Sequence, residues 1–253
     1  MGAVGSAVRS LRTAGAKAEV RLSRRDLFGY AAAAAAVGMT AAAPAARATG
    51  TFGTLVDYAG GVPSAGSIRD AGHIGVIRYV SDRRPGAEWM TGKPLLAREV
   101  DQLHAAGLHI VSNYQFGKGQ TADWRGGLEA GRRHAERGLA LHRAAGGPDG
   151  VPIYASIDDN PNAADFASMI APYLLGWHDV MGKENVGIYA NSPTIDWAIA
   201  AGLGSWYWQH NWGTPKGFVH SAAHLHQFEI DKSELDGISV DLNSVLRPDF
   251  GQW

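Results

Sequence analysis

Aspartates follow three separate apolar runs of the sequence, at the points where those runs end. Amide, tyrosine and arginine side chains stand at the ends of further runs of the same kind. Such groups can hydrogen-bond the hydroxyls of a sugar, provided that the ends of the runs meet in one place. The sequence therefore predicts a functional cleft, and the alternative is a polar rim without function. The predicted residues include Asp57, Arg78, Asn113, Asp158, Asp159, Gln209, Gln227 and Asp241.

Tryptophan is the second feature that indicates a sugar ligand. All eight tryptophans lie after residue 48, and three of them cluster around Tyr207. The face of an indole ring can cover the apolar C–H patches of a sugar. In a strand, Trp206 and Trp208 would share one face and Tyr207 would have the other, so at least one set is expected to be buried. We expect Trp212 and one of Trp206 and Trp208 to contact the ligand.

These residues need a fold that brings them together, and the chain alternates β-rich runs with helix-like stretches. Several runs are continuously apolar, as strands buried on both faces must be. The pattern predicts an α/β fold, an irregular (β/α) TIM-like barrel whose strands end at one common mouth. A doubly wound open sheet is the alternative, but no glycine-rich phosphate loop follows the first strand. The predicted strands are residues 53–58, 75–80, 109–115, 152–157, 186–189, 205–209, 224–228 and 238–240, and the predicted helices are residues 94–106, 124–144, 163–181 and 193–201.

Composition narrows the class of protein. The 253 residues are 45% hydrophobic and 19% charged, as in a soluble globular protein. Cysteine is absent, which excludes disulfides, thiolate metal sites and cysteine nucleophiles. Residues 1–48 hold seven Lys and Arg but only two Asp and Glu, so the remainder has an acidic excess. This excess argues against nucleic acid as a partner, because a nucleic-acid binder needs basic surface, and it favours neutral or cationic partners.

Residues 1–48 have the pattern of a targeting segment. Arg24 and Arg25 precede a weakly apolar, alanine-rich run over residues 30–43. Residues 46–48 then supply the small residues that signal peptidases recognise. Adjacent arginines before a mild apolar run resemble the twin-arginine export signal.

We therefore predict a targeting segment over residues 1–48 and one domain over residues 49–253. The twin-arginine translocase would export the protein to the cell envelope or the extracellular space. One alternative is that the first segment is an alanine-rich helix of the folded domain. Another is that the segment stays uncleaved and anchors the protein in the membrane.

Six motifs make the chain resemble the family-25 lysozymes over nearly all of residues 49–253. It is still more similar to an actinobacterial family of exported proteins with a glycoside-hydrolase-like domain of unknown function. The resemblance implies an irregular barrel whose mouth binds glycan, with Asp57, Asp158 and Asp241 where those lysozymes keep acidic groups. The motifs are residues 55–58, 152–159, 186–191, 206–209, 225–228 and 237–243.

One motif departs from the lysozyme pattern. Those lysozymes carry Asp-x-Glu at the end of the fourth strand, with the Glu as proton donor, whereas this sequence has Ser156-Ile157-Asp158 or Asp158-Asp159-Asn160. Glycoside cleavage needs a group that protonates the leaving oxygen and a second group that stabilises the developing cation. We expect Asp158 to be the acid, or Asp159 if the register is shifted, and Asp57 and Asp241 to be its electrostatic partners. Side chains expected to orient the sugar are Arg78, Asn113, Tyr189 and Gln227.

Two functions follow as expectations. The first is a cell-envelope glycoside hydrolase acting on a β-linked glycan such as peptidoglycan, and the second is a degenerate barrel that binds glycan without cutting it. No cofactor is expected. A transition metal held by His220, His224 and His226 is a minor alternative, because ordinary packing roles are open to these imidazoles.

Overall fold

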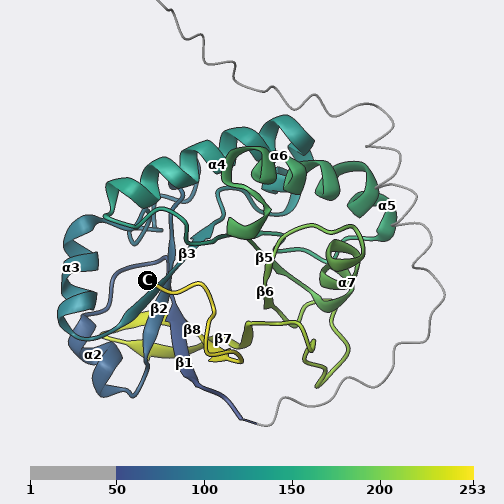
Figure 1. The fold of residues 1–253 in the computed structure, drawn as a ribbon. Coiled ribbons are helices and arrows are strands. Elements are labelled where there is room, and N and C mark those ends of the chain that lie inside the picture. Colours follow the sequence, from purple (N-terminus) through teal and green to yellow (C-terminus); the bar gives the residue numbers. More distant parts are fainter. Residues whose placement is uncertain (1–49) are drawn as a thin grey trace, which may run out of the picture.

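The computed structural model describes residues 50–253, which fold into a closed barrel of eight strands (Figure 1). Neighbouring strands from β1 to β7 are parallel, whereas β8 is antiparallel to both β7 and β1. The predicted irregular (β/α) barrel is confirmed, and the predicted targeting segment lies outside the described residues. The strands are β1 (Gly53–Asp57), β2 (Gly75–Tyr79), β3 (His109–Tyr114), β4 (Ile153–Ser156), β5 (Val186–Ala190), β6 (Trp206–Gln209), β7 (Leu225–Leu235) and β8 (Ile238–Val245).

Helices cover the barrel unevenly. The longest two, α4 and α6, lie side by side over it, whereas the part of residues 50–253 that follows β6 contains no helix (Figure 1). Within residues 50–253 no helix combines the length and the apolar character that a membrane span requires. The helices are α2 (Ala65–Asp70), α3 (Ala97–Ala105), α4 (Gly127–Ala144), α5 (Ala163–Asp165), α6 (Ala171–Met181) and α7 (Ser192–Ala200), with the short 3-10 helices η2 (Gly119–Thr121), η3 (Asp123–Gly126) and η5 (Lys183–Asn185) and the π-helical segment η4 (Phe166–Ile170), which joins α5 to α6.

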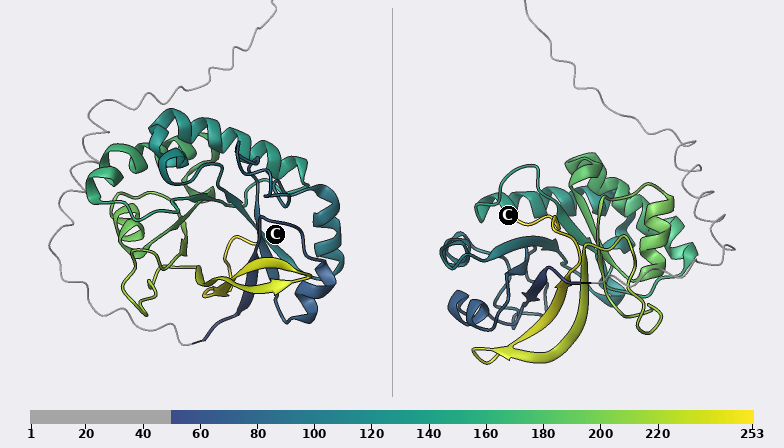
Figure 2. Two further views of the ribbon diagram at one scale, coloured as in Figure 1. Left: turned by 180° about the vertical axis from the view of Figure 1, so that it is seen from behind. Right: turned by 60° about the horizontal axis from the view of Figure 1, so that its bottom comes forward.

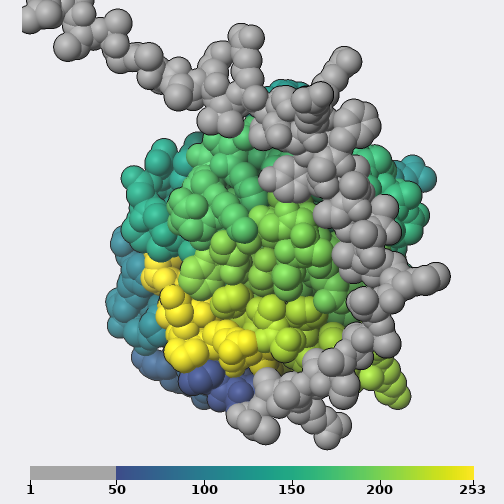
Figure 3. Space-filling view, turned by 45° about the vertical axis from the view of Figure 1, so that its right-hand side comes forward, coloured from purple at the N-terminus to yellow at the C-terminus, as the bar shows by residue number. Residues whose placement is uncertain are grey.

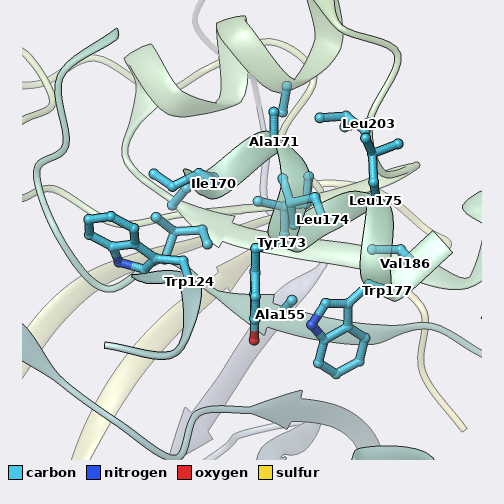
Figure 4. Close-up of a cluster of buried hydrophobic side chains, with 14 of the residues drawn as sticks. Trp124, Ala155, Ile170, Ala171, Tyr173, Leu174, Leu175, Trp177, Val186 and Leu203 are labelled. Atoms are coloured by element: carbon cyan, nitrogen blue, oxygen red, sulfur yellow. The ribbon is translucent and has the colours of Figure 1, made fainter. Parts of the chain in front are cut away.

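The contact between α4 and α6 depends on two glycines. A Cβ atom on Gly131 would collide with the backbone of Tyr173, and one on Gly176 would collide with the backbone of Leu128. The close approach of the two helices leaves their aromatic and aliphatic side chains to pack against the strands. Figure 4 shows this buried cluster, which includes Trp124, Ala155, Tyr173, Leu174, Trp177 and Val186.

The end of the chain closes one end of the barrel. Trp253 and Ile110 exchange two backbone hydrogen bonds of 2.9 Å. The hydroxyl of Tyr154 donates to the carbonyl oxygen of Phe250 at 2.9 Å. Phe250 also packs edge-on against His109, the first residue of β3, so this segment lies at the ends where the parallel strands begin. The interior above it is filled by Leu55, Ile77, Val111, Tyr154, Trp208, Leu225 and Val245.

Strands β7 and β8 form a hairpin that extends beyond the barrel (Figure 2). Its turn is Asp236-Gly237, and both residues have the positive φ that a tight hairpin turn needs. The predicted short strands at residues 224–228 and 238–240 are therefore wrong in length. Because β8 runs antiparallel to β1, Asp241 reaches the mouth from within its strand instead of following the strand's end.

The first and last strands close the barrel. Gly53 pairs with Val245 at one end of this ladder and Asp57 pairs with Asp241 at the other. Accordingly, the first described residues and the C-terminal part of the chain lie next to each other on the face in Figure 3. The closure places two of the predicted aspartates directly opposite each other.

Candidate active site

A cavity of about 410 Å³ opens at the ends of the parallel strands. Its size falls within the range of ligand-binding pockets. Six of the predicted residues line it, namely Asp57, Asn113, Asp158, Tyr189, Gln227 and Asp241. The other lining residues include Tyr58, Tyr79, Arg84, Trp89, Met90, Lys93, Gln115, Lys118, Trp208, Ile230, Asp231 and Ser239.

Asp57 is a buried carboxyl group at the end of β1. Its Oδ2 accepts hydrogen bonds from Asn243 Nδ2 at 2.8 Å and from Gln227 Nε2 at 3.1 Å, and its Oδ1 accepts one from the Tyr79 hydroxyl at 3.3 Å. Burial, followed by the charge of Asp241, raises the pKa of Asp57 from 3.8 to about 7 against the lowering effect of those donors. Asp57 can therefore hold a proton near neutral pH.

Asp241 shares a donor with Asp57. The Gln227 amide nitrogen also donates to Asp241 Oδ2 at 3.2 Å, and the Tyr189 hydroxyl donates to Gln227 Oε1 at 2.6 Å, which fixes the orientation of that amide. Burial is the main cause that raises the pKa of Asp241 to about 6. The two aspartates thus form a pair with raised pKa values, held together by Gln227.

Asp158 lies across the barrel from this pair, just after β4. Its Oδ2 accepts a hydrogen bond from Gln115 Nε2 at 2.9 Å and forms an ion pair with Lys118 Nζ, which is 3.0 Å away. A cation and an amide donor at one oxygen stabilise negative charge on it. Asp159 is directed elsewhere: it lies outside the cavity lining and faces Arg125 at 3.8 Å.

Arg78 was expected to orient the sugar, but the structure places it away from the cavity. Its side chain has no exposed surface and forms a buried ion pair with Glu99, with 2.5 Å between Nε and Oε1. Its other nitrogens donate to the carbonyl oxygens of Tyr58 and Gly92. Arg78 therefore fixes the backbone behind the cavity instead of reaching a ligand.

Gln209 is also directed away from the cavity. Its amide donates to the carbonyl oxygen of Phe218 at 2.8 Å and accepts from the backbone nitrogen of His220 at 2.7 Å. Both partners belong to the connection between β6 and β7, so Gln209 holds that connection in place. A polar residue at a strand end can serve the backbone as readily as a ligand, and here it does so.

The structure places the two kinds of predicted tryptophan differently with respect to the cavity. Trp208 lines the cavity from within the barrel and donates from Nε1 to Asn243 Oδ1 at 2.8 Å. Trp212 is 55% exposed but lies outside the cavity lining. The exposed ring at the cavity is Trp89, which is 61% exposed and was not among the predicted residues. Only its aromatic type could have identified Trp89, because residues 80–96 form no helix or strand and show no periodic pattern.

Cations were also missed by the sequence-based prediction. Arg84 and Lys93 line the cavity from the connection between β2 and α3, and Lys118 does so from the connection after β3. Burial, followed by the nearby charge of Arg84, lowers the pKa of Lys93 to about 7. The backbone before Lys118 is held by Asp123, whose carboxyl group accepts hydrogen bonds of 2.8 Å from the backbone nitrogens of Phe116 and Gly117.

The three histidines considered as metal ligands have separate partners. His220 contacts Asp196, His224 accepts from the backbone nitrogen of Tyr207, and His226 contacts Asn211. In the part of the chain that the structure describes, no three His, Cys, Asp or Glu side chains are grouped so that they could hold a metal ion.

Comparisons with known proteins bear on the whole domain. A family model described as "Rv2525c-like, glycoside hydrolase-like domain" matches residues 66–245. The chain is 56% identical over 237 residues to the candidate peptidoglycan hydrolase Rv2525c of Mycobacterium tuberculosis, covering 92% of this chain and 99% of that protein. The crystal structure of the Tat-secreted protein Rv2525c with L-tartrate is similar at a TM-score of 0.80 and 60% identity, covering 80% of this chain and all of that one.

A more distant likeness concerns the fold alone. A family-25 lysozyme of Aspergillus fumigatus has a TM-score of 0.50 at 13% identity, covering 78% of this chain and 94% of that one. At this identity the barrel architecture is shared, and the chemistry of the site has to be argued from the side chains themselves.

Proposed function

Because the chain belongs to the Rv2525c-like family of glycoside hydrolase-like domains, we propose that it is an exported cell-envelope protein that binds and hydrolyses a β-linked glycan such as peptidoglycan. The family resemblance predicted from the six motifs is confirmed by the matching family model. Export through the twin-arginine translocase belongs to the same proposal, and it is supported by the M. tuberculosis relative, which is described as Tat-secreted.

The observation that carries this proposal is the meeting of three aspartates in one cavity beside an exposed tryptophan. Asp57 and Asp241 come from paired strands and Asp158 from the far side of the barrel, and all three line the same space as Trp89. A carboxyl group that can hold a proton near neutral pH, with a further carboxyl group in the same site, meets the requirement for acid-assisted glycoside cleavage. The indole ring supplies the apolar contact that a sugar ring needs.

The geometry favours a different distribution of roles from the one that the sequence suggested. We propose that the Asp57–Asp241 pair, with its raised pKa values, holds the proton that is transferred to the glycosidic oxygen. As that proton arrives, the bond between the anomeric carbon and the oxygen breaks, and the leaving sugar keeps the electron pair as a hydroxyl group. Asp158, whose Oδ2 lies beside the Lys118 ammonium group, would stabilise the positive charge on the anomeric carbon. Water then supplies hydroxide to that carbon and returns a proton to the pair.

A second candidate function is supported by the contacts of Asp158. Its Oδ2 is already engaged by Gln115 and Lys118, and an aspartate holds its carboxyl group one methylene further back than a glutamate. A misplacement of about 1 Å can cost on the order of 100-fold in rate. The same cavity could therefore bind glycan without cutting it.

The experiment measures reducing ends released from purified peptidoglycan, with the products identified by mass spectrometry, alongside binding of soluble fragments. Asp57→Asn and Asp158→Asn should each abolish hydrolysis, whereas Asp159→Asn, next to Asp158 but outside the cavity, should retain it. Asp158→Glu should raise turnover if the site is a weak hydrolase. Binding without hydrolysis by the wild type and by Asp158→Glu would support the second candidate, and failure to bind any glycan would overturn the proposal.

A further inference from the structure

One stretch of irregular backbone supplies a distinct part of the cavity wall. Residues 80–96, between β2 and α3, contribute Arg84, Trp89, Met90 and Lys93 to the lining. This segment is fixed at its base, since the Gly92 nitrogen donates to the carbonyl oxygen of Ala59 and the Leu95 nitrogen to that of Tyr79, both at 2.9 Å. Its cations and its exposed ring are therefore presented together.

Arg84 and Lys93 lack acidic partners within the described residues. Neither of them forms a salt bridge with a carboxylate among residues 50–253. By contrast, Arg69, Arg78, Arg125, Arg132, Arg137 and Arg143 are each paired with a carboxylate in this part of the chain. Lys93 donates to the carbonyl oxygen of Gln115 at 2.8 Å, and its Nζ lies 3.9 Å from the centre of the Tyr79 ring.

The surroundings of Lys93 disfavour its charge. The side chain is 4% exposed, and the charges that act on it are those of Arg84 and Arg78, which oppose protonation, and those of Asp123 and Asp57, which favour it. A cation buried beside another cation costs free energy, which an anion binding between them would recover. Lys118, by contrast, already has Asp158 as its partner.

We propose that Arg84 and Lys93 form an anion subsite for a carboxylate carried by the glycan, so that the cavity selects an acidic sugar over its neutral counterpart. The inference rests on the proposed function, because it names the substrate class of the same site. The guanidinium can bind both oxygens of a carboxylate, and the ammonium adds a point charge. The acidic excess of residues 49–253 as a whole favoured neutral or cationic partners. This wall of the cavity, however, carries two cationic side chains and therefore suits an anionic group.

Carboxylate recognition at this wall also fits the position of the proposed chemistry. The carboxyl groups of Asp57, Asp158 and Asp241 come from β1, β4 and β8, whereas the two cations and Trp89 come from the segment over residues 80–96. A sugar that stacks on Trp89 would bring an acidic substituent to the cations and would keep it away from the aspartates, which would repel it.

The test uses a matched pair of ligands. One is a tetrasaccharide of alternating N-acetylglucosamine and N-acetylmuramic acid with free lactyl carboxylates, and the other is the same tetrasaccharide with those carboxylates reduced to alcohols. Dissociation constants are measured by calorimetry for the wild type, for Arg84→Gln and Lys93→Met, and for the control Arg83→Gln. Arg83 adjoins Arg84 but is exposed and outside the cavity lining.

The wild type should bind the acidic tetrasaccharide roughly tenfold more tightly than the reduced one, a difference of about 1.4 kcal/mol. Arg84→Gln and Lys93→Met should each remove most of that preference with little effect on the reduced ligand, and Arg83→Gln should leave it intact. Equal affinity of the wild type for the two ligands, or a preference that survives in Arg84→Gln, would overturn the inference alone. Failure to bind either ligand would overturn the proposed function as well.

Discussion

Replacement of Asp57 by Asn should stabilise the protein at high pH and give no gain in stability at low pH. The pKa of Asp57 is raised from 3.8 to about 7 in the folded state. Between these values the folded protein binds more protons than the unfolded chain, so the wild type loses stability as the pH rises from about 4 to about 7. Asparagine has no charge to bury, and the variant should be free of this loss.

The size of the effect follows from the shift. Each pKa unit corresponds to 1.36 kcal/mol, so a shift of about three units gives at most about 4 kcal/mol above pH 7. Asparagine Oδ1 can still accept from Asn243 and Gln227, while its amide nitrogen would face the Tyr79 hydroxyl, which would have to accept in place of donating. Allowing for that rearrangement, we expect a net gain of about 2 kcal/mol at pH 8, or about 4–8 °C in melting temperature.

Urea unfolding of the wild type and of Asp57→Asn, at intervals from pH 4 to pH 8, measures this difference. Asp241 also has a raised pKa, so the wild-type slope alone includes more than one group, and the difference between the two proteins is the quantity to follow. A difference that is constant across the pH range would refute the reasoning. So would a variant that is less stable than the wild type at pH 8, because the contacts of Asp57 would then outweigh the cost of burying its charge.

Three further predictions concern other parts of the molecule. Glu99→Gln should destabilise the domain by about 3–5 kcal/mol in urea unfolding at neutral pH, since it leaves a buried guanidinium without its counter-ion, and a loss below about 1 kcal/mol would contradict that role. Trp89→Ala should weaken glycan binding roughly tenfold in calorimetry without lowering the melting temperature, and Trp212→Ala, measured in parallel, tests the contact expected from the sequence. Replacing both Arg24 and Arg25 by Lys should leave the precursor in the cytoplasm on cell fractionation, and continued export would show that another signal is used.

The strands and the carboxyl groups could be predicted because their signals are local. A continuous apolar run such as Ile153–Ser156 is recognisable as a buried strand, and in a parallel barrel the position after it belongs to the mouth. This reasoning located Asp57 and Asp158 without knowledge of their contacts. It also placed Asp241 at the mouth, but by assuming that this residue follows the end of a parallel strand, whereas β8 is antiparallel and Asp241 lies within it.

The direction of a side chain at a strand end could not be predicted, because it depends on partners distant in the sequence. Arg78 is paired with Glu99, which a helix brings beneath it, and Gln209 is occupied by the backbone near Phe218. Trp89 lies in a segment whose form is set by hydrogen bonds to other loops, which leave no periodic pattern. The hairpin, by contrast, could have been predicted, because Asp236-Gly237 lies between stretches in which apolar and polar residues alternate, and this pattern is a recognisable turn signal.

The separate origins of the aspartates and of the wall formed by residues 80–96 bear on how such a protein can diversify. Residues on strands are constrained by the hydrogen-bond ladder, whereas a connecting segment accepts substitutions and changes in length at little cost to the barrel. A descendant could exchange Arg84, Trp89 and Lys93 for other residues and acquire a new ligand preference while its reactive groups stay in register. Transplanting this single segment between related barrels would therefore transfer ligand selectivity as a unit. The segment is a suitable target for engineering enzymes or lectins with altered specificity for cell-envelope polymers.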